Sequence, residues 1–299
     1  MKENHKFDPK EFIAKPGKSF SLKDYKTRYK GTSKDRSDAK TTLLDDVTAL
    51  AKAQDKLYAS RSHGVLIILQ ALDAAGKDGV IRHVMTGINP QGCQVYSFKG
   101  PTAEEKLHPF LWRPMLKIPE AGQIAIFNRS YYEEILVVKV HPEFLDGQFF
   151  PNGTREKNLD DLWEFRYKEI NNFEEWACKN GMTIIKIFLN LSKDEQRKRF
   201  LERIDNPAKN WKFSASDLKE RQCWKQYQKA FEEMLNETST KIAPWYVIPA
   251  DDKKYSRAIV SEIIRSRIEA LKLSYPKVSK EAKEALQLAK KQLLDEEKS

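Results

Sequence analysis

Short, continuous apolar runs recur along the chain and predict the strands of a buried parallel sheet. The first run, residues 65–69, reads VLIIL, which is typical of a strand covered on both faces. Similar runs follow at residues 94–98, 123–127, 183–189 and 245–248. Segments long enough to hold crossover helices separate them. The pattern therefore predicts an α/β protein with a right-handed, doubly wound parallel sheet of about five strands, which binds ligands beyond the carboxyl ends of those strands.

Helical spacing of apolar residues marks several of the intervening segments. Residues 42–59 and 159–179 each predict an amphipathic helix. Ser192 is a favourable N-cap for a charged helix over residues 193–204. A further helix is expected over residues 217–236, and a segment that contains Pro207, Lys209 and Lys212 interrupts the chain before it. We therefore expect a lid segment at about residues 204–216.

The chain divides into three parts by composition. Residues 1–41 are polar and predict a basic arm, which aromatic side chains can attach to the folded body. Residues 42–275 hold all the predicted strands and form one domain. Residues 276–299 contain apolar residues at helical spacing amid charges and predict a peripheral helix. The candidates for attaching the arm are Phe12, Phe20, Tyr25 and Tyr29.

The charge balance favours an anionic partner. The net charge is +10 and the isoelectric point is near 9.2. Residues 1–40 hold 12 basic and 6 acidic side chains, so this segment alone contributes more than half of the excess. Charge does not distinguish nucleic acid, acidic phospholipid and phosphate-rich small molecules.

Location follows from the cysteines and from the hydropathy of the chain. Three widely spaced cysteines match neither a secreted disulfide framework nor paired metal ligands. No stretch approaches the roughly 18 apolar residues of a membrane span. We expect a cytoplasmic protein without a membrane partner.

The residues after the first predicted strand have the features of a phosphate-binding loop. Residues 71–79 read ALDAAGKDG between a strand and a helix, so backbone N–H groups and Lys77 can hold phosphate oxygens. The usual consensus has glycine at Ala71 and a magnesium-binding hydroxyl at Asp78. Asp73 offers a compensating carboxylate for Mg²⁺. The alternative, a surface turn with a solvated lysine, is less consistent with this context.

A second motif, NRSYYE, follows the third predicted strand. In a doubly wound sheet this end lies near the phosphate loop, so Arg129 can neutralise phosphoryl charge and Glu133 can serve a metal or the acceptor. Asn128 stands where a conventional acidic box has aspartate, which leaves more of the metal charge to Asp73 and Glu133. The alternative is a capped turn in which Arg129 and Glu133 pair with each other.

The third group of candidates lies on the charged helix and the lid segment. Arg199 and Arg203 are four residues apart, so they share one helical face and both can hold an anion. Lys209 and Lys212 follow in the lid segment. A solvated helix is the commoner meaning of such a run, but arginine-bearing lids that exclude water from phosphoryl transfer favour the functional interpretation.

These motifs together resemble the polyphosphate kinase 2 family. The similarity runs over residues 43–273. Its strongest points are DAAGKDG at 73–79, GINPQG at 87–92, FNRSYYE at 127–133, SKDEQR at 192–197, NWKF at 210–213 and APWYVIPAD at 243–251. The resemblance implies a thymidylate-kinase-like P-loop kinase fold with a helical lid and flanking N- and C-terminal helices, which usually oligomerises as a homodimer or homotetramer.

The resemblance also implies an activity and assigns roles to residues. The activity is transfer of the terminal phosphoryl group of inorganic polyphosphate to AMP or ADP, giving ADP and ATP, with Mg²⁺ or alternatively Mn²⁺. The residues at positions 78, 128 and 133 are similar to the branch called class III, which accepts both nucleotides; guanine nucleotides are further candidates. The catalytic candidates are Asp73, Lys77, Arg129, Glu133, Arg199 and Arg203; the metal candidates are Asp73, Asn128 and Glu133; the nucleotide candidates are Asn128, Arg129 and Glu133.

The polyphosphate candidates form a row of cations around the loop, as a polyanion requires. Besides the loop itself, this row draws on the helix after it, on the segment after the second strand and on the lid segment. The polyphosphate-binding candidates are the loop residues Ala74, Ala75, Gly76, Lys77, Asp78 and Gly79 together with Arg82, Lys99, Arg113, Lys209 and Lys212; the row of cations also includes Arg129.

Two alternatives stay open from the residues alone. An ATP-dependent nucleotide or nucleoside kinase would use the same loop, lid and arginines, although the absence of Ser or Thr after Lys77 counts against it. A basic nucleic-acid-binding module would account for the isoelectric point, but the chain has no ribonucleoprotein, helix-turn-helix or zinc-finger signature. We therefore expect no nucleic-acid partner.

Overall fold

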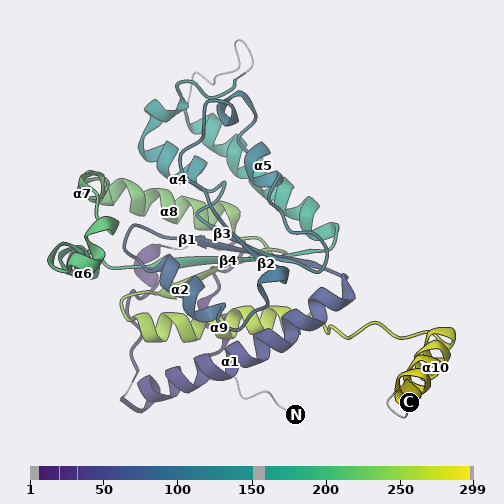
Figure 1. Cartoon of the computed structure of the whole chain (residues 1–299). Coiled ribbons are helices and arrows are strands. Elements are labelled where there is room, and N and C mark those ends of the chain that lie inside the picture. Colours follow the sequence, from purple (N-terminus) through teal and green to yellow (C-terminus); the bar gives the residue numbers. More distant parts are fainter. Residues whose placement is uncertain (1–6, 20, 32, 151–158, 297–299) are drawn as a thin grey trace.

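The structure is a computed structural model of the 299-residue chain. It describes residues 7–19, 21–31, 33–150 and 159–296. A central sheet lies between two layers of helices, and one C-terminal helix stands apart from them (Figure 1).

The five predicted strands form one parallel sheet in the order β2-β3-β1-β4-β5. This confirms the predicted fold class. In the register of the sheet, Leu69 of β1 and Ser97 of β2 both lie beside Asn128 of β3. The carboxyl ends of the three strands therefore meet, and the loops that follow them share one edge. The strands are β1 (Gly64–Gln70), β2 (Cys93–Ser97), β3 (Ile124–Asn128), β4 (Met182–Asn190) and β5 (Trp245–Pro249).

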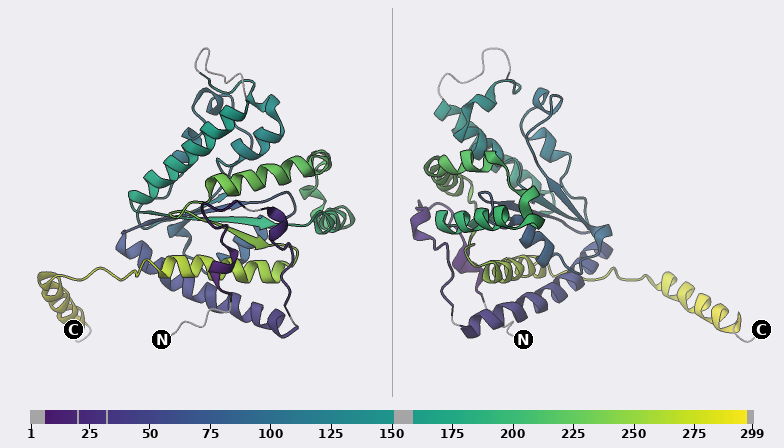
Figure 2. Two further views of the ribbon diagram at one scale, coloured as in Figure 1. Left: turned by 180° about the vertical axis from the view of Figure 1, so that it is seen from behind. Right: turned by 60° about the vertical axis from the view of Figure 1, so that its left-hand side comes forward.

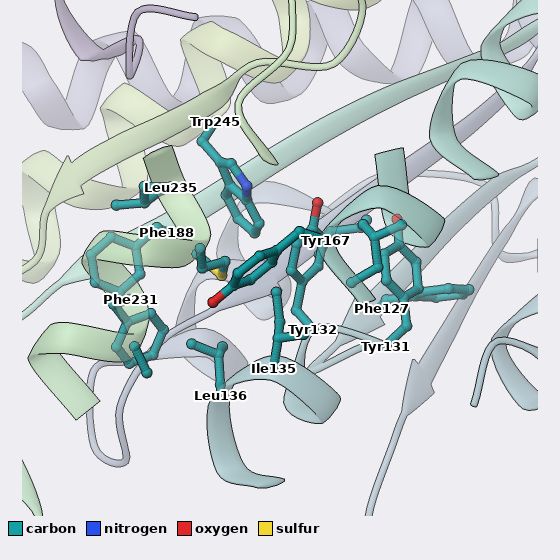
Figure 3. Close-up of a cluster of buried hydrophobic side chains, with 14 of the residues drawn as sticks. Phe127, Tyr131, Tyr132, Ile135, Leu136, Tyr167, Phe188, Phe231, Leu235 and Trp245 are labelled. Carbon is teal, nitrogen blue, oxygen red and sulfur yellow. The ribbon is translucent and has the colours of Figure 1, made fainter. Parts of the chain in front are cut away.

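Helices cover both faces of the sheet, in the layers that Figures 1 and 2 show. One face carries α1 (Ser33–Ser60), α2 (Lys77–Val84) and α9 (Lys253–Glu269); the other carries α4 (Glu133–Val140), α5 (Leu159–Lys179) and α8 (Trp224–Thr238). Side chains of β1 alternate between the two cores, because successive residues of a strand point to opposite faces. Figure 3 shows the aromatic part of the core beneath α4 and α8.

The N-terminal arm lies along the body. Ile13 forms an antiparallel bridge with Tyr246 at the edge of the sheet, and Phe12 is buried. Tyr25 packs against one core and Tyr29 against the other, as predicted, whereas Phe20 lies outside the described residues. The arm contains two short turns of 3₁₀-helix, Pro9–Phe12 and Leu22–Asp24.

The first helix begins earlier than predicted. Helix α1 starts at Ser33, not near residue 42. Its first turns lack an apolar stripe, so no period marked them; they continue a helix that α9 holds in place further along.

A second boundary also differs from the prediction. The expected single helix over residues 217–236 is divided into α7 (Ala215–Gln222) and α8. The chain turns at Cys223, whose N–H bonds to the carbonyl of Glu220. The division lets α8 pack on the sheet while α7 stays with the lid segment.

The remaining elements are short or peripheral. Helix α10 (Lys280–Glu296) has no buried residue and lies beyond an extended segment. No helix among the described residues combines the length and apolarity that a membrane crossing requires. The other elements are 3₁₀-helices at Pro90–Gly92, Glu105–Leu107, Pro142–Leu145 and Pro207–Lys212, and the α-helices α3 (Trp112–Met115) and α6 (Lys193–Asp205).

Candidate active site

The loop between β1 and α2 is shaped by two residues with left-handed backbone conformations. Gly76 has φ +110° and Ala74 has φ +62°. A residue with a Cβ adopts the first conformation only under strain, which explains the glycine before Lys77. The N–H of Val80 bonds to the carbonyl of Gly76, so α2 begins directly from the loop and its N-terminal end faces the loop's interior.

The Lys77 side chain is buried within this loop. Its Nζ donates to the carbonyl oxygen of Ala71 at 2.8 Å and lies 3.5 Å from that of Leu72. Burial and the neighbouring Arg129 together lower the pKa of Lys77 to about 8. An incoming phosphate would offset both effects, so this lysine is poised to bind an anion.

Arg129 connects the phosphate loop to the turn after β3. Its Nη2 lies 2.7 Å from Oδ1 of Asp73, and its Nη1 lies 3.5 Å from Oε2 of Glu133. Its backbone is also left-handed, with φ +64°. Burial raises the pKa of Glu133, while Arg129 opposes that shift. The sequence left open that Arg129 and Glu133 simply pair with each other in a turn. In the structure they do pair, and Arg129 also contacts Asp73 of the loop.

The lid segment contacts the loop through Asp78. Asn128 donates its amide to Oδ1 of Asp78 at 3.0 Å, and Nζ of Lys212 lies 3.7 Å from Oδ2. Arg203 donates to the carbonyl of Lys212 at 3.3 Å and lies 3.5 Å from Asp217. These contacts place the cationic side of the lid segment over the phosphate loop.

Arg199 supports the loop rather than the lid. It is 4% exposed, and its guanidinium donates to the carbonyls of Ala74 and Ala75 at 3.0 and 2.8 Å. It also bonds to the carbonyl of Ala250 and to Glu195. These contacts engage its guanidinium with the protein and connect helix α6 to the loop.

A cleft of about 680 Å³ opens in front of these groups. A second cavity of about 230 Å³ shares Asp73, Arg129 and Asp217 with it and includes Glu133. The two spaces therefore meet at the ion pair between Asp73 and Arg129. The predicted residues that line the cleft are Asp73, Ala74, Ala75, Gly76, Lys77, Asp78, Lys99, Asn128, Arg129, Arg199, Arg203, Lys209 and Lys212.

Comparison with known proteins identifies this arrangement. The family model described as Polyphosphate kinase 2 matches residues 32–276. The chain belongs to the polyphosphate kinase 2 family. This confirms the resemblance drawn from the sequence motifs and the phosphotransferase class that it implied.

Individual polyphosphate kinase 2 proteins match over most of their length. The chain is 50% identical over 289 residues to the ADP-polyphosphate phosphotransferase of Rhodopseudomonas palustris, covering 97% of this chain and 99% of that protein. It is 46% identical over 229 residues to the AMP/ADP-polyphosphate phosphotransferase of Meiothermus ruber, covering 76% and 80% respectively. The crystal structure of polyphosphate kinase 2 from Arthrobacter aurescens TC1 superposes with a TM-score of 0.83 at 38% identity, covering 95% of this chain and 97% of that one.

Three residues predicted for polyphosphate binding lie away from the cleft wall of this polyphosphate kinase 2 protein. Arg113 donates to the carbonyl of Lys99 and to Glu105, and its guanidinium stacks on Phe98. Gly79 and Arg82 lie on α2 beyond the loop. These residues were predicted because they lie close to the loop in the sequence. Closeness in the sequence does not determine the direction in which a side chain points.

The cleft also contains residues that the sequence did not indicate. Lys253, at the first turn of α9, and Asp217 of α7 line it, as does the 77% exposed Trp211. Lys253 follows the APWYVIPAD motif, which was the only available signal for it.

A buried polar network lies behind the turn that carries Arg129. Lys186 of β4 donates to Glu174 of α5 at 2.5 Å, to the hydroxyl of Tyr132 at 3.0 Å and to the carbonyl of Thr238 at 2.6 Å. Tyr131 and Tyr132 each donate to Glu174. Figure 3 shows both tyrosines within the core. Burial lowers the pKa of Lys186 and raises those of both tyrosines well above the usual value.

The oxygen donors of the cleft fit a divalent ion that arrives with phosphate. The described residues include no group of three or more acidic, histidine or cysteine side chains arranged to hold a metal. Mg²⁺ usually binds through one or two protein carboxylates together with substrate phosphates. The Asp73 carboxylate and the Asn128 amide oxygen, both at the cleft, match that mode, and Glu133 adds a carboxylate at the second cavity.

Proposed function

We propose that this protein transfers the terminal phosphoryl group of inorganic polyphosphate to ADP, giving ATP, and to AMP, giving ADP. The observation that best supports this function is the ion pair between Arg129 and Asp73. It lies in front of the buried Lys77, where the two cavities meet. The relatives named for ADP and for AMP/ADP as substrates support the choice of acceptors.

The residues of the site perform positioning and charge neutralisation. The loop amides and Lys77 hold the terminal phosphates of the donor, and Lys209 and Lys212 bind the preceding phosphates from the lid segment. Arg129 stands between donor and acceptor and neutralises the charge on the transferring phosphoryl group. Asp73 and Glu133 hold Arg129 in that position before substrate arrives.

We assign Asp73, Asn128 and Glu133 as the residues that would hold Mg²⁺, or Mn²⁺ in its place. When bound, the ion offsets negative charge on the phosphate oxygens. Closure of the lid segment would exclude water and thereby favour transfer over hydrolysis.

Nucleotide choice, assembly and location complete the proposal. Glu133, Asn128 and Asp78 support use of both AMP and ADP, with guanine nucleotides as further acceptors. We propose a homodimer or homotetramer in the cytoplasm; the three cysteines are free thiols in the structure, which supports a reducing location.

The deciding experiment is a luminescence assay of ATP formed from ADP, Mg²⁺ and long-chain polyphosphate, repeated with AMP in place of ADP. ATP from ADP establishes polyphosphate as the donor, and ATP from AMP shows that both steps occur on one protein. Lys77→Ala should abolish both signals. If no product forms and added ATP phosphorylates another nucleotide instead, the proposal fails in favour of an ATP-dependent kinase.

A further inference from the structure

A row of cations leaves the cleft along α9 and α2. Lys253 lines the cleft, and Arg257 lies one turn further along α9. Helix α2 packs against α9. A Cβ built on Gly79 of α2 would lie 3.1 Å from Nη2 of Arg257, so Arg257 reaches the helix that begins at the phosphate loop. Arg82, one turn after Asp78 on that helix, is exposed.

This row has few anionic partners. Lys209 and Lys253 share the single carboxylate of Glu202, at 3.6 and 3.9 Å. Within the described ranges of the chain, no carboxylate lies within ion-pair distance of Arg82 or Arg257. Positive charges that face one another without a counterion raise the free energy of the folded protein.

Arg257 lies among other cations that disfavour its charged form. Burial and the neighbouring Arg82 lower the pKa of Arg257. Burial and then Arg257 lower the pKa of His83, which stands beside them on α2. The surface is therefore one of concentrated positive potential that a polyanion would relieve.

We propose that Lys253, Arg257 and Arg82 form a second binding segment for linear polyphosphate, which holds the part of a long chain that extends beyond the cleft. This inference rests on the proposed function. A short oligophosphate ends within the cleft, whereas a long chain continues past Lys253 onto α9 and α2. The segment thus gives the protein a preference for long chains without taking part in the transfer.

The test is the variant Arg82→Gln/Arg257→Gln, assayed with ADP and either long-chain polyphosphate or hexaphosphate. The ratio of the KM for long-chain polyphosphate to the KM for hexaphosphate should rise about tenfold, because only the long chain loses contacts. The slope of log KM for the long chain against log salt concentration should become shallower by roughly 1.5, since each neutralised phosphate contributes about 0.7–0.9.

The matched control is Lys283→Gln/Lys290→Gln on the exposed helix α10, which removes the same charge away from the row. Its KM ratio should match that of the wild type, and melting temperatures should confirm that both variants fold. An equal rise in both KM values for the arginine variant would overturn the proposal, because the two arginines would then act on the loop through Gly79. The same change in the control would also overturn it.

Measurement of polyphosphate binding tests this inference independently of the proposed function. If the wild type transfers nothing from polyphosphate, the proposed function fails, and equilibrium binding of long-chain polyphosphate still tests the row. Weaker binding by the arginine variant than by the α10 control supports the row, and equal binding contradicts it. Tighter binding of single-stranded RNA than of polyphosphate, lost in the arginine variant, would assign the row to nucleic acid and overturn the proposal.

Discussion

Two ionic clusters flank the same turn, residues 129–133, and differ in what surrounds them. On the cleft side, Arg129 joins Asp73 and Glu133, and its side chain is 39% exposed. On the core side, Lys186 joins Glu174 with both side chains at most 1% exposed. The first cluster faces the cleft, whereas the second is closed to solvent.

The difference lies in how completely each cluster is satisfied. Lys186 has three N–H donors and three acceptors, and Glu174 accepts from both tyrosines as well. A buried charge is tolerated only when it is paired and hydrogen-bonded in this way. Arg129 keeps its charge accessible beside carboxylates that a phosphate can displace. The buried cluster thus holds the turn in place, and the exposed cluster presents the Arg129 charge to the cleft.

The largest expected effect comes from breaking the buried cluster. Lys186→Met leaves the Glu174 carboxylate buried without its cation, and we expect a loss of about 3–5 kcal/mol in the free energy of unfolding. Urea unfolding followed by circular dichroism measures it. The double variant Lys186→Met/Glu174→Gln should recover part of that loss. A single-variant loss below about 1 kcal/mol would show that the network does not hold the turn.

Breaking the exposed cluster should affect activity instead of stability. Arg129→Ala removes charge neutralisation at the transferring group, and we expect kcat to fall at least about a hundredfold. Partly exposed ion pairs contribute about 0–1 kcal/mol, so the urea midpoint should change little. Steady-state ATP formation and urea unfolding measure the two effects. Near-normal transfer by this variant would remove Arg129 from the mechanism.

The pH dependence of activity should report on Lys77, which lies on the cleft side of the turn. Lys77 has its pKa lowered to about 8, so it carries its charge below that pH and loses it above. We expect kcat/KM for polyphosphate to be flat up to pH about 8 and to fall as much as about tenfold per unit above it. Lys77→Arg, which stays charged, should flatten the fall in whatever activity it retains. A wild-type profile without a fall by pH about 9.5 would contradict the lowered pKa.

The smallest effect should come from helix α10, which stands apart from both clusters. Helix α10 has no buried residue and residues 277–279 are exposed, so deletion of residues 277–299 removes no core packing formed by residues 277–296. We expect the free energy of unfolding to change by less than about 0.5 kcal/mol. Urea unfolding of the shortened chain measures it. A loss above about 2 kcal/mol would mean that α10 packs against the body or a second copy in solution.

The sequence by itself determined the sheet and the core of the site. Apolar runs marked all five strands. Burial on both faces requires such runs in β1, β3, β4 and β5, whereas the edge strand β2 is only partly buried. Strand, glycine turn and lysine in immediate succession marked the phosphate loop, and the NRSYYE motif marked the turn that reaches it. These features depend on neighbouring residues, whose spacing the sequence states directly.

Only the tertiary structure decided which distant side chains meet. Arg199 and Arg203 share a helix, yet one supports the loop carbonyls and the other contacts the lid segment. Arg82 lies outside the lining of the cleft and stands next to Arg257, 175 residues later in the chain. Such partners depend on how α2, α6 and α9 pack against one another. Local periodicity specifies which face of a helix is buried, but the crossing of two helices specifies which charges are brought together.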